Sequence, residues 1–165
     1  MSSSLYNDNA KFGAISLETQ ISTQGLDLCN QIMRGELPAP TMWRTLNVMM
    51  MEAEDGRVVF KGKPMEEHYN PSGVVHGGWA GGILDSALGC CVWTKVPLGL
   101  AYTTAEFKVN LIRPITEQSG EVFAEGKVIH VGRKLAISEA SLKTAEGKLL
   151  AHGTETCAIF DPVSR

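Results

Sequence analysis

The feature that most constrains the fold is a helical segment over residues 76–95 that is unusually rich in glycine. Its apolar residues recur at helical spacing: Trp79, Ile83, Leu84, Leu88, Cys91 and Val92. Its interior also holds Gly78, Gly81, Gly82 and Gly89, and each such glycine costs roughly 1 kcal/mol relative to alanine. Spacings of three and four residues place these glycines and Asp85 on one narrow stripe. The segment therefore predicts a central helix that is enclosed by a sheet or pressed against a second copy of itself.

A turn leads directly into this helix and supplies candidate chemistry. Residues 70–73 read Asn-Pro-Ser-Gly, a typical turn composition, and His76 and Gly77 then start the helix. The N-terminus of a helix offers unpaired backbone N–H groups and the positive end of the helix dipole. It is therefore suited to hold an oxygen on which negative charge develops. Asp85 follows among apolar and small neighbours, the setting expected of a catalytic base or nucleophile.

The remaining segments predict an α+β fold with an antiparallel sheet. We expect a helix over residues 17–33 that stops at Gly35, a rigid connector over 37–40, and a hairpin of strands 43–54 and 57–64 around Asp55-Gly56. After the central helix we expect strands over residues 101–113, 119–131, 135–144 and 149–160, arranged as a meander. Runs of strands beside segregated helices favour α+β over alternating α/β.

The strand expected over residues 101–113 and the chain ends complete this outline. Ala105, Phe107, Val109 and Leu111 alternate with polar residues, which predicts one buried face of that strand. A single domain is expected over residues 16–160, with tails at 1–15 and 161–165.

Composition narrows the classes of partner. The net charge of −3 lacks the basic footprint of a nucleic-acid-binding protein. No run of about 18 apolar residues predicts a membrane span, and the N-terminus lacks the layout of a signal peptide. We therefore expect neither nucleic acid nor a membrane as partner. The cysteines show no metal-ligand spacing, so we expect no metal site and free thiols in a reducing cytoplasm. They are Cys29, Cys90, Cys91 and Cys157.

The start of the central helix carries a motif that resembles the hotdog-fold thioesterases, specifically the PaaI-like phenylacetate-degradation branch that acts on acyl-CoA esters. The motif is Asn70-Pro-x-Gly-x-x-His76-Gly77-Gly78, followed by Asp85 and Ser86. The resemblance continues through residues 102–114 and 131–133 and covers about residues 17–160. It implies a hotdog fold, in which an antiparallel sheet wraps around a long central helix, and at least a homodimer. We expect a homotetramer and no cofactor, since CoA is part of the substrate.

Helix geometry bears on how such a site is assembled. From His76 to Asp85 is nine residues, which is about 13.5 Å of rise and roughly half a revolution. Asp85 therefore cannot reach a carbonyl bound at the start of its own helix. Two antiparallel copies of the helix would remove this difficulty. The resemblance implies the same arrangement, with two composite sites per dimer.

The resemblance implies a role for each residue of the motif. The Gly77 N–H would hold the thioester oxygen. Asp85 of the partner subunit would attack the carbonyl directly or activate a water. Asn70 would position the water or the carboxylate, and His76 would orient the loop or contact the thioester.

Further candidates lie outside the motif. Thr104 falls where the resemblance implies a hydroxyl near the acid. Arg133 and Lys134, in an expected hairpin turn, would bind the phosphates of CoA. Trp79, Leu84 and residues of the first helix are expected to form walls of the acyl pocket.

Each residue also has a purely structural interpretation. Asn70 can be a turn residue, and His76 can be a cap of the helix. Asp85 can be a helix residue that faces solvent. Arg133 and Lys134 can be solvated cations of an exposed turn.

From these residues we expect an acyl-CoA thioesterase that hydrolyses an aromatic or medium-chain acyl-CoA to the free acid and CoA. Two alternatives remain open: a hotdog dehydratase or hydratase that uses His76 and Asp85, and a non-catalytic acyl-CoA-binding module. The first is disfavoured because the His-x-Pro-rich loop of such enzymes is absent. The second is disfavoured because Asn70, Gly77 and Asp85 occur together.

Overall fold

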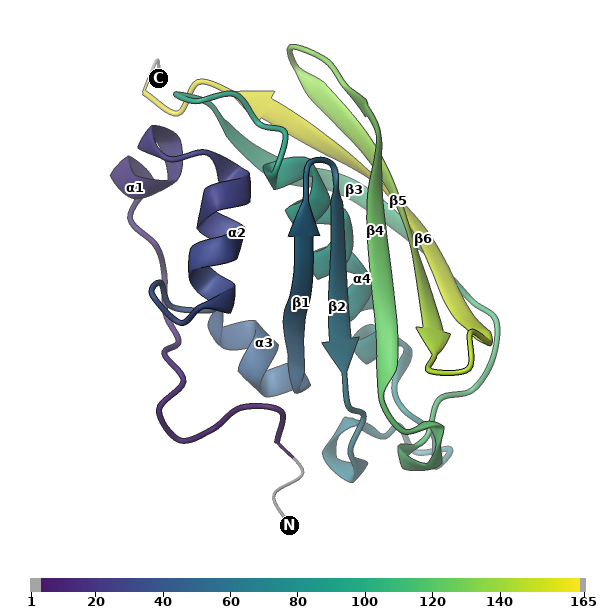
Figure 1. The fold of residues 1–165 in the computed structure, drawn as a ribbon. Helices are drawn as coiled ribbons and strands as arrows, with labels where there is room; N and C mark the ends of the chain where they lie inside the picture. Colours follow the sequence, from purple (N-terminus) through teal and green to yellow (C-terminus); the bar gives the residue numbers. More distant parts are fainter. Residues whose placement is uncertain (1–3, 164–165) are drawn as a thin grey trace.

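The computed structural model of the protein describes residues 4–163 and contains a six-stranded sheet with helices packed against it (Figure 1). The helices are α1 (Leu17–Ser22), α2 (Gly25–Met33), α3 (Thr41–Leu46) and α4 (Gly77–Trp93), with 3-10 turns η1 (Glu66–His68) and η2 (Glu117–Ser119). The strands are β1 (Val48–Glu54), β2 (Arg57–Gly62), β3 (Ala101–Leu111), β4 (Val122–Val131), β5 (Leu135–Thr144) and β6 (Leu149–Phe160). All strand pairs are antiparallel.

Helix α4 lies against one face of the sheet and contacts every strand (Figure 1). Its residues Ile83, Leu84 and Leu88 are completely buried. They form the centre of the core together with inward-facing residues of the strands. The α+β class and the sheet wrapped around a long central helix are therefore confirmed.

The contact between α4 and the sheet depends on a glycine of the sheet. A Cβ on Gly126 in β4 would lie 2.7 Å from the Ala87 carbonyl carbon and closer still to its oxygen. Glycine in a strand thus lets the helix backbone approach directly. The glycine stripe of α4 meets side chains of the same chain instead, since Gly81 faces Phe107 and Gly82 faces Leu46. Within one chain, these two glycines of the stripe therefore contact side chains and not, as expected, another backbone segment.

The helix expected over residues 17–33 is interrupted. The backbone is extended at Thr23 and Gln24, between α1 and α2. A Cβ on Gly25 would lie 2.6 Å from the Trp93 carbonyl carbon. The break therefore seats the first turn of α2 directly on the end of α4.

The strand expected over residues 43–54 begins later than the sequence indicates. Residues 43–46 belong to α3, and Asn47 adopts a left-handed conformation (φ 52°) that ends this helix and leads into β1. The hairpin after β1 is confirmed, with Gly56 at a positive φ of 81° as its turn requires.

The expected meander of the last four strands is wrong in one respect. The strands lie in the order β1-β2-β4-β5-β6-β3, so β3 pairs with β6 at one edge of the sheet while β4 pairs with β2. The reason is that α4, which precedes β3, crosses the sheet and delivers the chain to its far edge. The expected buried face of β3 is also wrong for a single chain. Of the four apolar side chains expected on it, only Val109 is half-buried among the described residues, and the other three are exposed. Phe107 is 44% exposed and Leu111 is 59% exposed.

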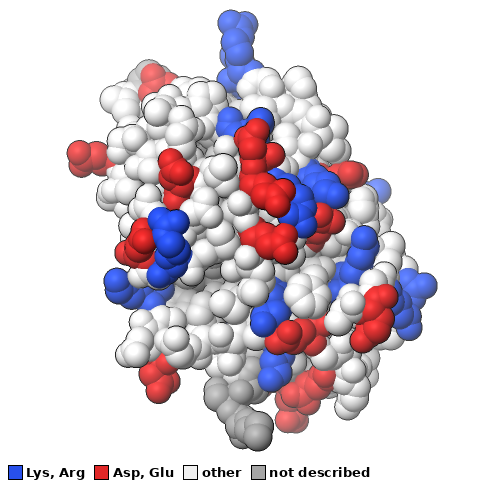
Figure 2. All heavy atoms as spheres, viewed as in Figure 1, with Lys and Arg blue, Asp and Glu red and all other residues white. Residues whose placement is uncertain are grey.

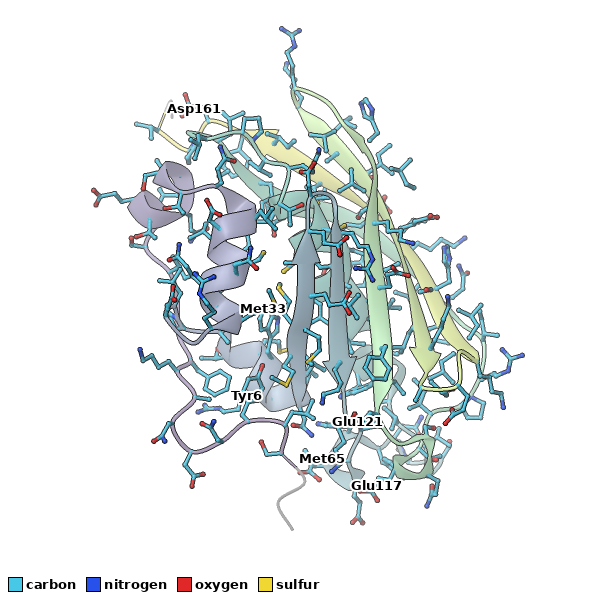
Figure 3. All side chains as sticks on the ribbon, in the orientation of Figure 1. Tyr6, Met33, Met65, Glu117, Glu121 and Asp161 are labelled. Carbon is cyan, nitrogen blue, oxygen red and sulfur yellow. The ribbon has the colours of Figure 1, made fainter. Side chains whose placement is uncertain are left out.

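The N-terminal segment packs on the domain, although the sequence places residues 1–15 in a tail. The Leu5 N–H donates to Asn47 Oδ1 at 2.8 Å, and the Tyr6 hydroxyl donates to the Val48 carbonyl at 2.6 Å. In Figure 3 the labelled Tyr6 and Met33 lie on the side of the molecule that carries α2 and α3. Residues 1–3 and 164–165 of the expected tails lie outside the described residues.

The surface viewed in Figure 2 carries acidic and basic side chains interspersed with neutral ones. Arg57, for example, pairs with Glu125 at 2.6 Å and with Glu52 at 2.8 Å. Partly exposed pairs of this kind contribute little to stability individually. Among residues 4–163, no helix has the length and apolar character needed to cross a membrane.

Candidate active site

An open cavity of about 670 Å³ lies between α4, the start of β3 and the N-terminal segments that precede β1. Asp85 and Ser86 of α4 and Thr104 of β3 line it. The apolar and aromatic part of the lining comprises Ile15, Ile32, Met42, Trp43, Trp93 and Tyr102. The cavity thus combines a carboxylate and a hydroxyl with an apolar space.

The tryptophan that forms a wall of this cavity differs from the expected one. Trp79 and Leu84 are buried in the core and do not line the cavity. The Trp79 indole N–H donates to the Leu46 carbonyl at 2.7 Å. Trp43 lines the cavity instead, and its indole N–H donates to Ser86 Oγ at 3.2 Å. The end of α3, expected as strand, therefore contributes to the site.

Asp85 is the carboxylate of the cavity and has no partner within residues 4–163. It is half-buried, and no hydrogen bond or ion pair to its side chain is found among the described residues. Burial raises the pKa of the Asp85 carboxyl above its usual value. An unpaired carboxylate with a raised pKa is suited to accept a proton.

Thr104 is held by a carboxylate that sequence reasoning missed. Thr104 Oγ1 donates to Glu155 Oε1 at 2.9 Å, and the Cys157 thiol donates to the same oxygen at 2.9 Å. Glu155 Oε2 is buried without a hydrogen-bond partner within the described residues. Glu155 is only 1% exposed and is the one charged residue buried in the described part of the chain.

The environment of Glu155 explains its protonation behaviour. Burial raises the pKa of the Glu155 carboxyl, the hydrogen bonds from Cys157 and Thr104 oppose this rise, and the charge of Asp85 adds to it. One signal for Glu155 is present in the sequence. Gly153, Glu155 and Cys157 occupy alternating positions of β6 and all lie on its buried face. A glutamate is unexpected on a buried face of a strand.

The loop before α4 is organised by Asn70 and His76. Asn70 Oδ1 accepts hydrogen bonds from the backbone N–H groups of Ser72 at 2.9 Å and of Val74 at 3.5 Å. His76 is the N-cap of α4, and its Nδ1 accepts from the Gly78 N–H at 2.9 Å. A neutral His76 ring therefore carries its hydrogen on Nε2. Both side chains fulfil structural roles in this loop.

Gly77 is the first residue of α4 and lies apart from the cavity. Its N–H has no hydrogen-bond partner within residues 4–163, as expected for the first turn of a helix. The Leu111 side chain of β3 lies beside it, because a Cβ on Gly77 would be 2.7 Å from Leu111 Cδ1. Gly77 and Asp85 are eight residues apart on one helix, which is about 12 Å of rise. One chain therefore does not bring the two residues together.

The remaining candidates do not line the cavity either. Arg133 and Lys134 lie in the exposed turn between β4 and β5 and are not among the residues that line the cavity. Within residues 4–163, no group of three or more potential metal-ligating side chains is found.

Comparison with known proteins agrees with this architecture. The family model described as "Thioesterase superfamily" matches residues 72–151, which contain α4 and the start of β6. A protein of Saccharolobus solfataricus named "Putative esterase SSO2140" is 32% identical over 111 residues, which cover 67% of this chain and 77% of the relative.

Solved structures share the fold. A Ralstonia eutropha protein named "putative thioesterase, phenylacetic acid degradation-related protein" is 25% identical, with a TM-score of 0.71, over 79% of this chain and 98% of its own. A hypothetical thioesterase from Streptococcus pneumoniae, solved with coenzyme A, is 23% identical, with a TM-score of 0.62, over 70% of this chain and 87% of its own. Together with the sequence matches, these likenesses identify the chain as a member of the thioesterase superfamily, a PaaI-like thioester hydrolase with the hotdog fold.

Proposed function

We propose that the protein is an acyl-CoA thioesterase that hydrolyses an aromatic or medium-chain acyl-CoA to the free acid and CoA. The observation that carries this proposal is the unpaired, half-buried Asp85 in the same cavity as the Thr104 hydroxyl. The apolar and aromatic lining from Trp43, Trp93 and Met42 suits an acyl group of that kind. The coenzyme A bound to the Streptococcus pneumoniae thioesterase supports CoA as the leaving group.

In the proposed reaction, the Asp85 carboxylate acts as general base. It takes one proton from a water molecule. The second hydrogen of this water stays on the water oxygen and forms a hydrogen bond to Thr104 Oγ1. The water oxygen then forms a bond to the thioester carbon, and the carbonyl π electrons move to the oxygen. When this tetrahedral intermediate collapses, the carbon–sulfur bond breaks, and the CoA thiolate takes the proton back from Asp85. The products are the free acid and CoA, and Asp85 returns to its starting state.

The oxyanion of this intermediate needs a hydrogen-bond donor. The unpaired N–H of Gly77 is suited to this role because it lies at the positive end of the α4 dipole. About 12 Å of helix separates it from Asp85 of the same chain. We therefore assign the oxyanion to the Gly77 N–H of one subunit and the base to Asp85 of the partner subunit.

The edge strand β3 offers a surface for the required dimer. Its outer edge is unpaired in the sheet, and exposed edges of this kind favour pairing with another strand. Phe107 and Leu111 are exposed on it and lie beside Gly81 and Gly77 at the start of α4. Pairing of two β3 edges would bring two copies of α4 together with opposite directions. A dimer of such dimers is the proposed tetramer, and light scattering coupled to gel filtration measures both states.

Thiol release tests the activity directly. The purified protein is incubated with phenylacetyl-CoA, benzoyl-CoA and medium-chain acyl-CoAs, and free thiol is followed with a chromogenic disulfide. Hydrolysis of at least one of these thioesters is expected. Binding of acyl-CoA without thiol release by the folded protein would overturn the proposal and favour a non-catalytic binding module. Hydration of an enoyl-CoA without thiol release would favour a hotdog hydratase.

Subunit mixing tests the composite site. Gly77→Pro removes the N–H donor, and proline is favoured at the first position of a helix. His76 already has φ −60° and ψ 137°, which suits a residue before proline. Each of Gly77→Pro and Asp85→Asn is expected to be inactive alone, while mixed dimers regain one intact site and up to about half of the activity per exchanged dimer. No recovery after confirmed subunit exchange would contradict the shared site.

A further inference from the structure

We propose that Glu155 is a positioning residue that fixes the direction of the Thr104 hydroxyl and thereby orients the water that Asp85 deprotonates. This inference rests on the proposed hydrolytic function and adds to it a residue outside the cavity lining. It starts from the buried carboxylate described above, which the proposed reaction does not otherwise use.

The hydrogen-bond directions determine what Thr104 can offer to the cavity. A threonine hydroxyl has a single hydrogen and two lone pairs. That hydrogen points to Glu155 Oε1, at 2.9 Å. The Thr104 oxygen therefore faces the cavity as an acceptor only, and it can bind a water hydrogen but cannot donate to the Asp85 carboxylate.

This acceptor complements Asp85. A water molecule has two hydrogens, and two separate acceptors hold both of them while leaving a lone pair free to attack. Without Glu155, the Thr104 hydroxyl is free to rotate and to donate its hydrogen to the nearby Asp85 carboxylate. Asp85 would then be satisfied without a water, and the base would be less available.

The position of Glu155 supports a role at this site. Glu155 Oε1 lies 3.6 Å from where a Cβ on Gly89 would be, and Gly89 is one helical turn beyond Asp85 on the same stripe of α4. Glu155 therefore lies directly beside α4 at the level of the cavity. Other groups around it are the Cys157 thiol, the Tyr102 hydroxyl near the same glycine, and Asp85, whose charge opposes ionisation of Glu155.

The burial of Glu155 is not explained by stability. A buried carboxylate with one oxygen lacking any partner is unfavourable, and neutral side chains fill such positions at lower cost. The same pair of strands also carries an exposed counterpart, since Thr156 Oγ1 donates to Glu106 Oε1 at 2.9 Å. Strand pairing therefore does not need the buried version, and the counterpart provides a matched control.

A double-mutant cycle in the full-length protein tests the inference. Thr104→Val removes the hydroxyl and Glu155→Gln removes the charged acceptor. Each single variant is expected to lower kcat by about tenfold to a hundredfold with KM changed less than about threefold, because in the proposed reaction the Thr104 hydroxyl binds the attacking water and Glu155 acts only through that hydroxyl. In the Thr104→Val background, Glu155→Gln is expected to change kcat by less than about twofold, since it acts only through Thr104. Thr104→Ser, which keeps the donor, is expected to retain most of kcat.

Controls separate this outcome from others. Thr156→Val on β6 removes the donor of the exposed counterpart and is expected to leave kcat within about twofold of wild type. Wild-type kcat in Glu155→Gln, or single losses that multiply in the double variant, would overturn the positioning role. If Glu155→Gln fails to fold, Thr104→Val is compared with Thr104→Ser instead. Equal kcat values in these two variants would also overturn the positioning role, because only the serine keeps a hydroxyl that can donate to Glu155. Absence of thiol release by the wild type is seen before any variant is compared and contradicts the hydrolytic function itself.

Discussion

The close contact between Gly126 and Ala87 predicts that a single methyl group in the sheet lowers both stability and activity. In Gly126→Ala, the new Cβ would lie 2.7 Å from the Ala87 carbonyl carbon, whereas ordinary contacts begin at 3.4 Å. Both partners are backbone, so no side-chain rotation relieves the clash. Helix α4 must move away from the sheet by about 1 Å at this point, which is the overpacked situation of a rigid core.

The magnitude follows from the rigidity of this contact. Overpacking costs about 1–3 kcal/mol, and we expect the upper end because β4 is paired on both sides. For a chain of this length, about 3 kcal/mol corresponds to a fall in Tm of roughly 6–12 °C. Ala87 is two residues beyond Asp85, so the same movement displaces the base relative to Thr104. A displacement of about 1 Å can lower kcat by about a hundredfold.

Calorimetry and thiol release measure the two effects on the same preparation. The matched control is Gly89→Ala in α4, where the new Cβ finds no atom closer than 3.6 Å. This control is expected to be as stable as wild type or more stable by up to about 1 kcal/mol, because alanine is the better helix former. If Gly126→Ala unfolds within about 2 °C of wild type, the contact is not rigid and the argument fails.

Four further predictions concern the carboxylates and the edge strand. Asp85→Asn is expected to lower kcat by about 10²–10⁴-fold with its Tm and acyl-CoA binding retained, and retention of wild-type turnover would show that another group is the base. Burial raises the pKa of Asp85, and the base must be ionised to act. We therefore expect kcat to fall as the pH drops, with a midpoint above the usual aspartate pKa of about 3.9. A midpoint at or below that pKa would contradict the role of burial. The raised pKa of Glu155 means that the folded state binds its proton more tightly than the unfolded state, so this contribution to stability is present at low pH and is lost as the pH rises through the folded pKa. Glu155→Gln is therefore expected to have a higher Tm than wild type at pH 8 and a smaller advantage near pH 4, and scanning calorimetry at both values tests the sign. If the proposed dimer forms through β3, Phe107→Asp with Leu111→Asp is expected to yield inactive monomers, and an active monomer in gel filtration would remove the need for a shared site.

Several features of the fold and one of the site were predictable from the sequence because they depend on local geometry. The Asp55-Gly56 turn, the length of α4 and the strands β5 and β6 follow from short-range patterns and are confirmed. The separation of Gly77 and Asp85 follows from the helix rise alone. By contrast, the sequence predicts strand from residue 43, although residues 43–46 belong to α3. The two turns of α3 are too short for a clear helical period, and Asn47 ends the helix.

The family motif, the α+β class and the position of Asp85 on a central helix can all be read from the sequence, since they depend on residues close together in the chain. The exposed edge position of β3, the place of Trp43 in the cavity wall and the hydrogen bond from Thr104 to Glu155 appear only in the folded molecule. The last two residues are 51 positions apart. Alternation shows that a strand residue faces inward, but which residue it meets depends on strand order and register, and these are set by packing of the whole sheet on α4.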